Sequence, residues 1–443
     1  MRTVVRYWGQ KTGPMVAYIL DNILKSVKDK IILDPFGGTG SIVIEALRRN
    51  ARIIYIDINP YAYLVTRVHL EGCDKIRLEK LVNKILSRKR LVYLKHNGKI
   101  GYVDWDIIYS VKTYNHRCLQ VKYFVWEGEK CSAVTTNGEV IKGCKDFERG
   151  VPYYWYPKDT KLWYPWNQPF DKRRNYDYLY QFFTNRNLII LTNIYRDIKR
   201  ISRKYERERN VLLLAFLSIL YLSSKMARLG AGSWGINSYW VPYKHIEKNP
   251  YNLFQHKIRR IMKACNNAML IGKEIVYNVN DIQEVIKGKA KAALILGDAY
   301  ETLKRIPSGL IDYVITDPPH ADEIQYLELS HFMNSWIPEL LPKNAFEQEI
   351  IYNKRQGKDF TTYLSMLKRV YREIHRILKG NGKFILIYHE EDTQRLSKMI
   401  GIVGEVGFKI ENRIYTRMQE QRKIGAKDEI KGKDVLIIVA RKS

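Results

Sequence analysis

Residues 317–320 (Asp-Pro-Pro-His) have the types and spacing best suited to chemistry on an aromatic amine. They follow the apolar run 311–315, which predicts a β-strand, so the acid stands at a strand end. The Asp317 carboxylate and the Pro318 carbonyl could accept the two protons of an amine and aim its lone pair, while paired prolines hold the turn rigid. The sequence therefore predicts a catalytic turn made of Asp317, Pro318, Pro319 and His320.

A second candidate site lies in the glycine-rich turn at residues 34–40 (DPFGGTG). The turn separates a short strand, residues 31–33, from a helical pattern, and the next strand, residues 53–56, ends at Asp57. Strand, glycine turn, helix, strand and acid is the order that binds a nucleoside cofactor, with the acid on the ribose hydroxyls. Val43 replaces the third glycine or alanine of a nicotinamide site, and the loop has no Lys or Arg for phosphates, which disfavours a dinucleotide.

The elements that must position these two sites form one α/β domain divided in two. Strands are expected at 31–33, 53–56, 293–296, 311–315, 383–388, 409–416 and 434–440, with helices between them. They predict a Rossmann-like sheet of seven strands built from residues 1–74 and 290–443. Residues 75–289 would then be a large insertion, expected to be α-rich, between the second and third strands.

Positive charge is concentrated in that insertion. The 443 residues include 75 Lys and Arg against 46 Asp and Glu, a formal net charge of +29. Residues 75–289 hold 40 basic and 18 acidic side chains, with 7 of the 9 Trp and 19 of the 32 Tyr. Basic residues interleaved with aromatics favour a nucleic-acid partner. The expected nucleic-acid contacts are Lys172, Arg173, Arg174, Arg228, Lys257, Arg259, Arg260 and Tyr326.

Several other classes of protein are disfavoured. The longest apolar run, residues 211–222, is too short to span a bilayer, and the N-terminus leads into no apolar signal core, so a cytoplasmic protein is expected. No cysteine follows a proline, which disfavours thiolate attack on a pyrimidine C5. Cys118, Cys131 and Cys144 form no C-x-x-C pair, so no metal site is expected.

The glycine turn closely resembles motif I of the S-adenosylmethionine-dependent amino-methyltransferases. More narrowly, the chain resembles the prokaryotic adenine-specific DNA methylases that often contain a zinc ribbon. The similarity is carried by residues 6–11, 34–40, 57–62, 162–165, 169–170, 183–188, 247–249, 317–319 and 326–332. It implies a methyltransferase sheet with its last strand antiparallel, the α order of motifs, and direct methyl transfer to N6 of an adenine flipped out of duplex DNA. It also implies S-adenosyl-L-methionine as cofactor, bound by Lys11, Asp34, Phe36, Gly37, Gly38, Gly40, Asp57, Asp298 and Ala299.

Two departures from the family keep alternatives open. His320 stands where members usually carry Tyr or Phe, so Tyr326 could take over stacking on the base. The paired cysteines of the zinc ribbon are missing. The same acceptors suit cytosine N4 and, with an RNA-binding domain, guanine N2 of RNA. A catalytically silent nucleic-acid-binding protein of the same fold is the alternative from another class.

Overall fold

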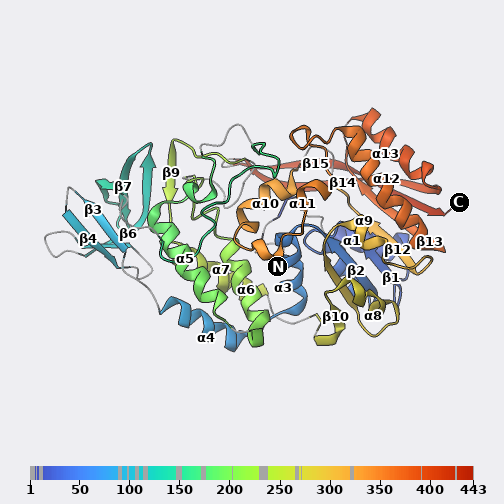
Figure 1. Ribbon diagram of the computed structural model, residues 1–443, viewed down its shortest axis with the longest axis horizontal. Coiled ribbons are helices and arrows are strands. Elements are labelled where there is room, and N and C mark those ends of the chain that lie inside the picture. The colour runs from blue at the N-terminus through green and yellow to red at the C-terminus, as the bar shows by residue number, and fades with distance from the viewer. Residues whose placement is uncertain are drawn as a thin grey trace. The chain divides into compact units, whose positions relative to one another are not determined.

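The computed structural model describes residues 5, 7–8, 13–87, 92–96, 99–104, 109–112, 118–145, 152–170, 176–201, 203–228, 238–264, 269–270, 272–319, 324–390, 392–424 and 427–442 (Figure 1). For residues 92–120, 143–145 and 417–434 of these ranges, the backbone alone is described. The chain forms two compact units. The first contains residues 1–6, 72–267 and 331–336, and the second contains residues 7–71, 268–330 and 337–443.

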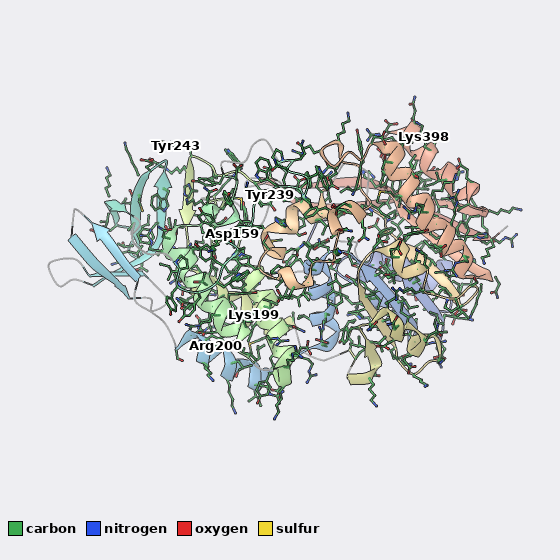
Figure 2. The ribbon with its side chains drawn as sticks, in the orientation of Figure 1. Asp159, Lys199, Arg200, Tyr239, Tyr243 and Lys398 are labelled. Atoms are coloured by element: carbon green, nitrogen blue, oxygen red, sulfur yellow. The ribbon has the colours of Figure 1, made fainter. Side chains whose placement is uncertain are left out.

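Four mutually contacting helices form one part of the first unit. They are α4 (Lys75–Leu86), α5 (Asn185–Lys199), α6 (Glu206–Leu217) and α7 (Pro250–Ala264). Of the long apolar run 211–222, expected as a buried helix, residues 211–217 lie in α6 and are buried, and the helix ends at Leu217. Basic side chains lie at the end of α5, where Lys199 is in the last turn and Arg200 follows the helix (Figure 2).

The other part of the first unit is an antiparallel sheet in the order β5-β4-β3-β8-β7-β6-β9. Its strands are β3 (Val92–His96), β4 (Lys99–Asp104), β5 (Tyr109–Lys112), β6 (Cys118–Glu127), β7 (Lys130–Thr135), β8 (Val140–Lys145) and β9 (Lys244–Glu247). Strand β5 pairs with β6 as well as β4, so six strands close into a ring. The α-rich expectation missed this sheet, because its short strands mix Lys and Tyr with apolar residues and show no clean alternation.

A buried ion pair joins the two parts of the first unit. Arg186, in the first turn of α5, makes a 2.8 Å contact with Glu247 at the end of β9, and both side chains are at most 2% exposed. Thr184 and Trp126 also donate to the Glu247 carboxylate. Burial alone would raise the pKa of Glu247, but Arg186 and these donors hold that pKa below its usual range.

The second unit is built on an eight-stranded sheet in the order β10-β11-β2-β1-β12-β13-β15-β14. Its strands are β1 (Ile31–Asp34), β2 (Arg52–Asp57), β10 (Ile275–Val276), β11 (Ala292–Leu296), β12 (Ile311–Thr316), β13 (Leu378–Tyr388), β14 (Phe408–Ile424) and β15 (Lys427–Lys442). All pairs from β10 to β13 are parallel, and β15 lies antiparallel between β13 and β14. The Rossmann-like α/β prediction is confirmed. The count of seven was one short, because the two-residue edge strand β10 is too brief to show a period.

Helices cover both faces of this sheet. Along β1, Ile31 and Leu33 enter one apolar core and Ile32 enters the other, as the period of two in a strand requires. The first core is covered by α8 (Ile282–Ile286), α9 (Ala299–Leu303), α12 (Phe360–Ile377) and α13 (Thr393–Glu405). The second is covered by α1 (Gly13–Tyr18), the π-helix η1 (Ile19–Ile23), α2 (Ser41–Arg48) and α3 (Pro60–Glu71).

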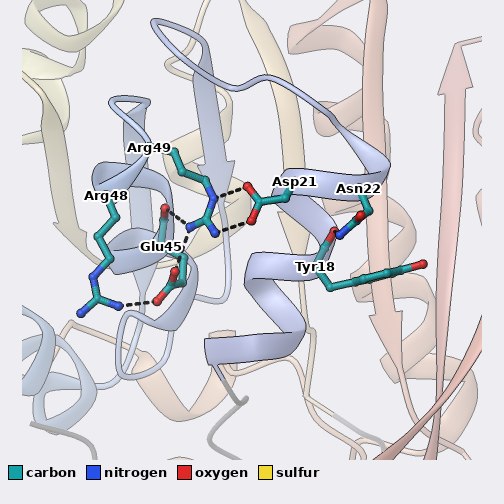
Figure 3. A network of polar contacts seen from close by, with 6 residues as sticks. All are labelled: Tyr18, Asp21, Asn22, Glu45, Arg48 and Arg49. Carbon is teal, nitrogen blue, oxygen red and sulfur yellow. Dashed lines mark hydrogen bonds and ion pairs between the residues drawn. The ribbon is translucent and has the colours of Figure 1, made fainter.

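Arg49 fastens α2 to η1 (Figure 3). Its guanidinium donates to both carboxylate oxygens of Asp21 at 2.6 Å and to the Glu45 carboxylate at 2.8 Å. Arg48 donates to the other Glu45 oxygen at 2.7 Å. A bidentate pair fixes direction as well as distance, so this network orients the helix that follows the glycine turn.

Candidate active site

Four neighbouring strands of the second unit bring an acid each to one edge of the sheet. In the order β11, β2, β1 and β12, the acids are Asp298 two residues after its strand, Asp57 and Asp34 as last residues of theirs, and Asp317 directly after its strand. Carboxyl ends of parallel strands meet at one edge, which is where doubly wound proteins bind ligands. The four acids line one pocket, together with residues 7–8, 35–39, 41–42, 58–59, 297, 299, 319, 326–327 and 348–350.

The pocket is strongly acidic. Glu349 is its fifth carboxylate, and no Lys, Arg or His stands among the described lining residues. Burial raises the pKa of Asp34, Asp298 and Glu349, and raises the pKa of Asp57 to about 6. A bound cation would favour the ionised form of these buried acids, whereas a phosphate would oppose it, so the lining fits the sulfonium of S-adenosylmethionine.

Two glycines shape the turn between β1 and α2 for different reasons. A Cβ on Gly37 would overlap the Tyr55 ring, so the backbone there approaches the sheet more closely than any side chain permits. Gly40 has a φ of +75° as the residue before α2, and a Cβ there would clash with Thr66 at 2.6 Å. Gly38 completes the turn by donating its amide to Asp57 Oδ2 at 2.7 Å.

Asp57 is held in a fixed orientation. Its second oxygen, Oδ1, accepts the Asn59 amide at 2.8 Å. These two amides favour the charged carboxylate and partly oppose the effect of burial on the pKa of Asp57. Each carboxylate oxygen has a further lone pair, so Asp57 can still accept two hydroxyl protons from a ribose.

The predicted catalytic turn is fixed by a helix that begins some 40 residues later in the chain. The Tyr363 hydroxyl, on α12, donates to the Pro319 carbonyl at 2.6 Å. Asp317 and Pro319 line the pocket, while Pro318 is buried and does not. His320 lies outside the described residues.

Tyr7, Tyr326 and Glu349 form a further part of the pocket wall. Tyr7 and Tyr326 stack with ring centroids 5.7 Å apart and planes at 23°. The buried Glu349 accepts the Leu327 amide at 2.9 Å in the first turn of α10 (Tyr326–Asn334). Sequence reasoning missed Glu349, because its role depends on a contact with a residue 22 positions earlier in the chain. The sequence did point to Tyr7, because residues 6–11 are among those that resemble the adenine-specific DNA methylases.

Gly40 and Pro318 lie in the two predicted turns without lining the pocket, and His320 lies outside the described residues; the other predicted site residues divide into three groups. Those that line the pocket are Asp34, Phe36, Gly37, Gly38, Asp57, Asp298, Ala299, Asp317, Pro319 and Tyr326. In the first unit, Arg228 is exposed over the Trp240 ring, and Lys257, Arg259 and Arg260 lie on α7. Lys11 and residues 172–174 lie outside the described residues.

The structure agrees with the class that the sequence predicted, an S-adenosylmethionine-dependent methyltransferase. The sheet is doubly wound with an antiparallel strand beside its end, a glycine turn follows β1, and an acidic pocket lies at the carboxyl ends of the strands. The chain belongs to the D12 class N6 adenine-specific DNA methyltransferase family, whose sequence profile matches residues 7–290. The matched range ends before Asp317.

The individual relatives described next share little sequence identity with this chain. The Type II methyltransferase M.MjaII of Methanocaldococcus jannaschii is 23% identical over 410 residues, which are 87% of this chain and 71% of the relative. The Thermus thermophilus protein TTHA0409, assigned as a DNA modification methylase and solved with S-adenosyl-L-methionine, is 20% identical with a TM-score of 0.19. That match covers 33% of this chain and 51% of TTHA0409, so it spans about half of the solved protein. PH1948 of Pyrococcus horikoshii, assigned as an RNA methyltransferase, is 14% identical, with 57% and 96% covered and a TM-score of 0.19.

Two features are absent from the described ranges. No helix there is long and apolar enough to cross a membrane. No group of three or more His, Cys, Asp or Glu side chains in those ranges could hold a metal ion.

Proposed function

We propose that the acidic pocket binds S-adenosyl-L-methionine and that Asp317 and Pro318 hold the N6 amine of an adenine extruded from duplex DNA. The observation that carries this proposal is the convergence of Asp34, Asp57, Asp298 and Asp317 on one pocket without a described cation. Asp57 would bind the ribose, Asp298 the adenine of the cofactor, and the glycine turn with Phe36 the methionine half. Lys11 would help to close the pocket.

The cofactor supplies an activated methyl group on sulfur. The contribution of the protein is position and electrostatics. The N6 lone pair of adenine is delocalised into the ring, and acceptors for its two protons return electron density to nitrogen. Asp317 and the Pro318 carbonyl would be those acceptors, with Tyr363 holding the turn through Pro319. The turn would hold the amine with its lone pair toward the methyl group that the bound cofactor supplies, and the Asp317 carboxylate would accept the proton that N6 releases on transfer.

Tyr326 fits the role of stacking on the extruded base, and His320 would follow the turn as a second ring. Tyr326 lines the same pocket as Asp317 and already stacks on Tyr7. Stacking on an aromatic side chain offsets part of the cost of removing a base from the duplex.

The first unit offers a surface for the DNA backbone. A groove of about 470 Å³ between α4 and α7 is lined by Lys75, Arg259 and Lys263, with Glu79 as its one acid among the described lining residues. The α7 sequence contains four Lys and Arg residues and no acid. Such a groove suits phosphates rather than base edges. Residues 172–174, Arg228, Lys257 and Arg260 would extend this contact.

The proposal is tested by transferring a labelled methyl group to nucleic acid. We expect label in duplex DNA and not in RNA of the same sequence. The variant Asp317→Asn, which keeps the shape and loses the charge of one acceptor, should lower the rate by about 100-fold or more. Its affinity for S-adenosylhomocysteine should stay within about twofold, since its role is on the amine. Label in RNA alone, or undiminished turnover of Asp317→Asn, would refute the proposal, and absent cofactor binding would favour the silent alternative.

A further inference from the structure

We infer that Asn59 is a positioning residue that couples the cofactor side of the pocket, at Asp57, to the Tyr7–Tyr326 aromatic pair on its target-base side. The inference rests on the proposed function of the pocket. It adds a coupling between two parts of that pocket, so that a bound cofactor organises the place where the base is received.

Asn59 forms hydrogen bonds to both parts of the pocket, through its backbone to Asp57 and through its side chain to Tyr7 and Ser330. Its backbone amide donates to Asp57 Oδ1 at 2.8 Å. Its side-chain Nδ2 donates to the Tyr7 hydroxyl at 3.0 Å and to Ser330 Oγ at 2.8 Å. Its Oδ1 accepts the Tyr61 amide at 3.1 Å, which fixes which end of the side-chain amide faces Tyr7. The residue is 1% exposed, so water does not compete for these bonds.

The two hydrogen bonds donated by Asn59 Nδ2 both lead to Tyr326, one through the Tyr7 ring and one through the Ser330 hydroxyl. Tyr7 presents its ring to Tyr326. Ser330 Oγ in turn donates to the Tyr326 carbonyl at 2.6 Å, so Asn59 reaches the backbone of Tyr326 through one intervening hydroxyl. Because α10 begins at Tyr326, a shift of Asn59 acts on both the stacked ring and the first turn of the helix.

A ligand bound at Asp57 would reduce the motion of the residues that these contacts link. Ribose hydroxyls that bond to the carboxylate would further restrict the motion that the Gly38 and Asn59 amides leave to it, and the Asn59 backbone amide is anchored to that same carboxylate. Pro60 follows directly and begins α3, so Asn59 has little freedom to move alone. Order imposed on Asp57 therefore lowers the entropic cost of ordering Tyr326 and the first turn of α10. The linkage is reciprocal: a base held at Tyr326 would tighten cofactor binding by the same factor.

Amide hydrogen exchange measures this coupling without any need for turnover. S-adenosylhomocysteine added to the full chain should slow exchange of residues 327–330 by about fivefold or more, the lower range of known coupling factors. The double variant Tyr7→Phe with Ser330→Ala removes both acceptors of Asn59 Nδ2 and keeps every ring and carboxylate of the pocket. In this variant the ligand-induced slowing of residues 327–330 should disappear, while slowing at residues 37–40 remains.

A matched control separates coupling from loss of stability. Tyr277→Phe removes a tyrosine hydroxyl that donates to Glu71 in the same unit. Neither residue belongs to the contacts that join Asp57, Asn59 and Tyr326. It should leave the ligand-induced slowing at residues 327–330 as in the native chain. Slowing that survives in the double variant, or that is absent from the native chain while the ligand binds, overturns the inference. A chain that fails to bind S-adenosylhomocysteine at all contradicts the proposed function instead.

Discussion

Single residues give the pocket its chemical character, and Asp57 shows how. Burial raises the pKa of Asp57 to about 6, while the amides of Gly38 and Asn59 favour its charged form. The carboxylate must be charged to accept two hydroxyl protons, because a protonated acid would itself be a donor. If Asp57 binds the ribose as proposed, cofactor binding would depend on a group whose pKa burial raises to about 6.

Cofactor affinity should fall as the pH drops through about 6. The sign follows from the raised pKa of Asp57: above about pH 6 the group is ionised and accepts hydroxyl protons, and below it the acceptors are lost. The dissociation constant of S-adenosylhomocysteine, measured by calorimetry between about pH 5 and 8, should increase up to about tenfold per pH unit on the acid side. Asp57→Asn should bind weakly at every pH. An affinity of the native chain that is constant across this range would show that Asp57 does not carry the binding.

At the scale of elements, the parts predicted from sequence are those with local patterns. An apolar run followed by paired prolines predicted strand β12 and the turn after it. An apolar run followed by glycines predicted β1 and its turn in the same way. Strands β3 to β8 could not, because their stability depends on pairing with one another rather than on alternation. The roles of Glu349 and Tyr363 were beyond prediction for a similar reason. Glu349 reaches the pocket wall only because the fold brings it to the Leu327 amide, and Tyr363 acts on the pocket through the carbonyl of Pro319.

The pair α4 and α7 should determine the salt dependence of DNA binding. Each phosphate contact contributes about 0.9 to the slope of log affinity against log salt. Replacing Lys75, Arg259 and Lys263 by Ala should therefore lower that slope by about 2 to 3 in fluorescence anisotropy titrations. The rate at saturating DNA should be unchanged, because the proposed role of the groove is to bind the DNA backbone and not the reacting base.

A charge-matched variant controls this measurement. Lys28, Lys287 and Lys398 are exposed lysines of the second unit, and Lys398 projects from α13 (Figure 2). Their replacement by Ala removes the same charge and should change the slope by less than about 1. Equal effects of the two triple variants would mean that net charge, and not the groove, governs binding.

The Arg186–Glu247 pair should be essential to the first unit. Arg186→Met leaves the Glu247 carboxylate buried without its cation, which we expect to cost about 3–5 kcal/mol in urea unfolding. The double variant with Glu247→Gln should recover much of that loss. Because the pKa of Glu247 is held low in the fold, the contribution of the native pair is present at neutral pH and declines as the pH falls through the carboxylate range. A loss below about 1 kcal/mol in Arg186→Met would contradict the assigned role.

At the scale of the whole molecule, the acidic pocket and the basic groove lie in different units. The pocket and all five of its carboxylates lie in the second unit, whereas the basic groove and the ring of strands lie in the first. The excess of basic residues that residues 75–289 contribute to the sequence is thus separate from the acidic pocket. An enzyme that binds a cationic cofactor and a polyanionic substrate gains from this separation, because each site can carry the charge its ligand requires.

The most direct test of the account is nucleoside analysis of duplex DNA incubated with the full chain and S-adenosyl-L-methionine. Mass spectrometry of the digested DNA should show N6-methyladenine with the native chain and none above background with Asp317→Ala. N4-methylcytosine as the product, or N6-methyladenine formed equally by Asp317→Ala, would contradict the central claim that the Asp317 turn methylates adenine.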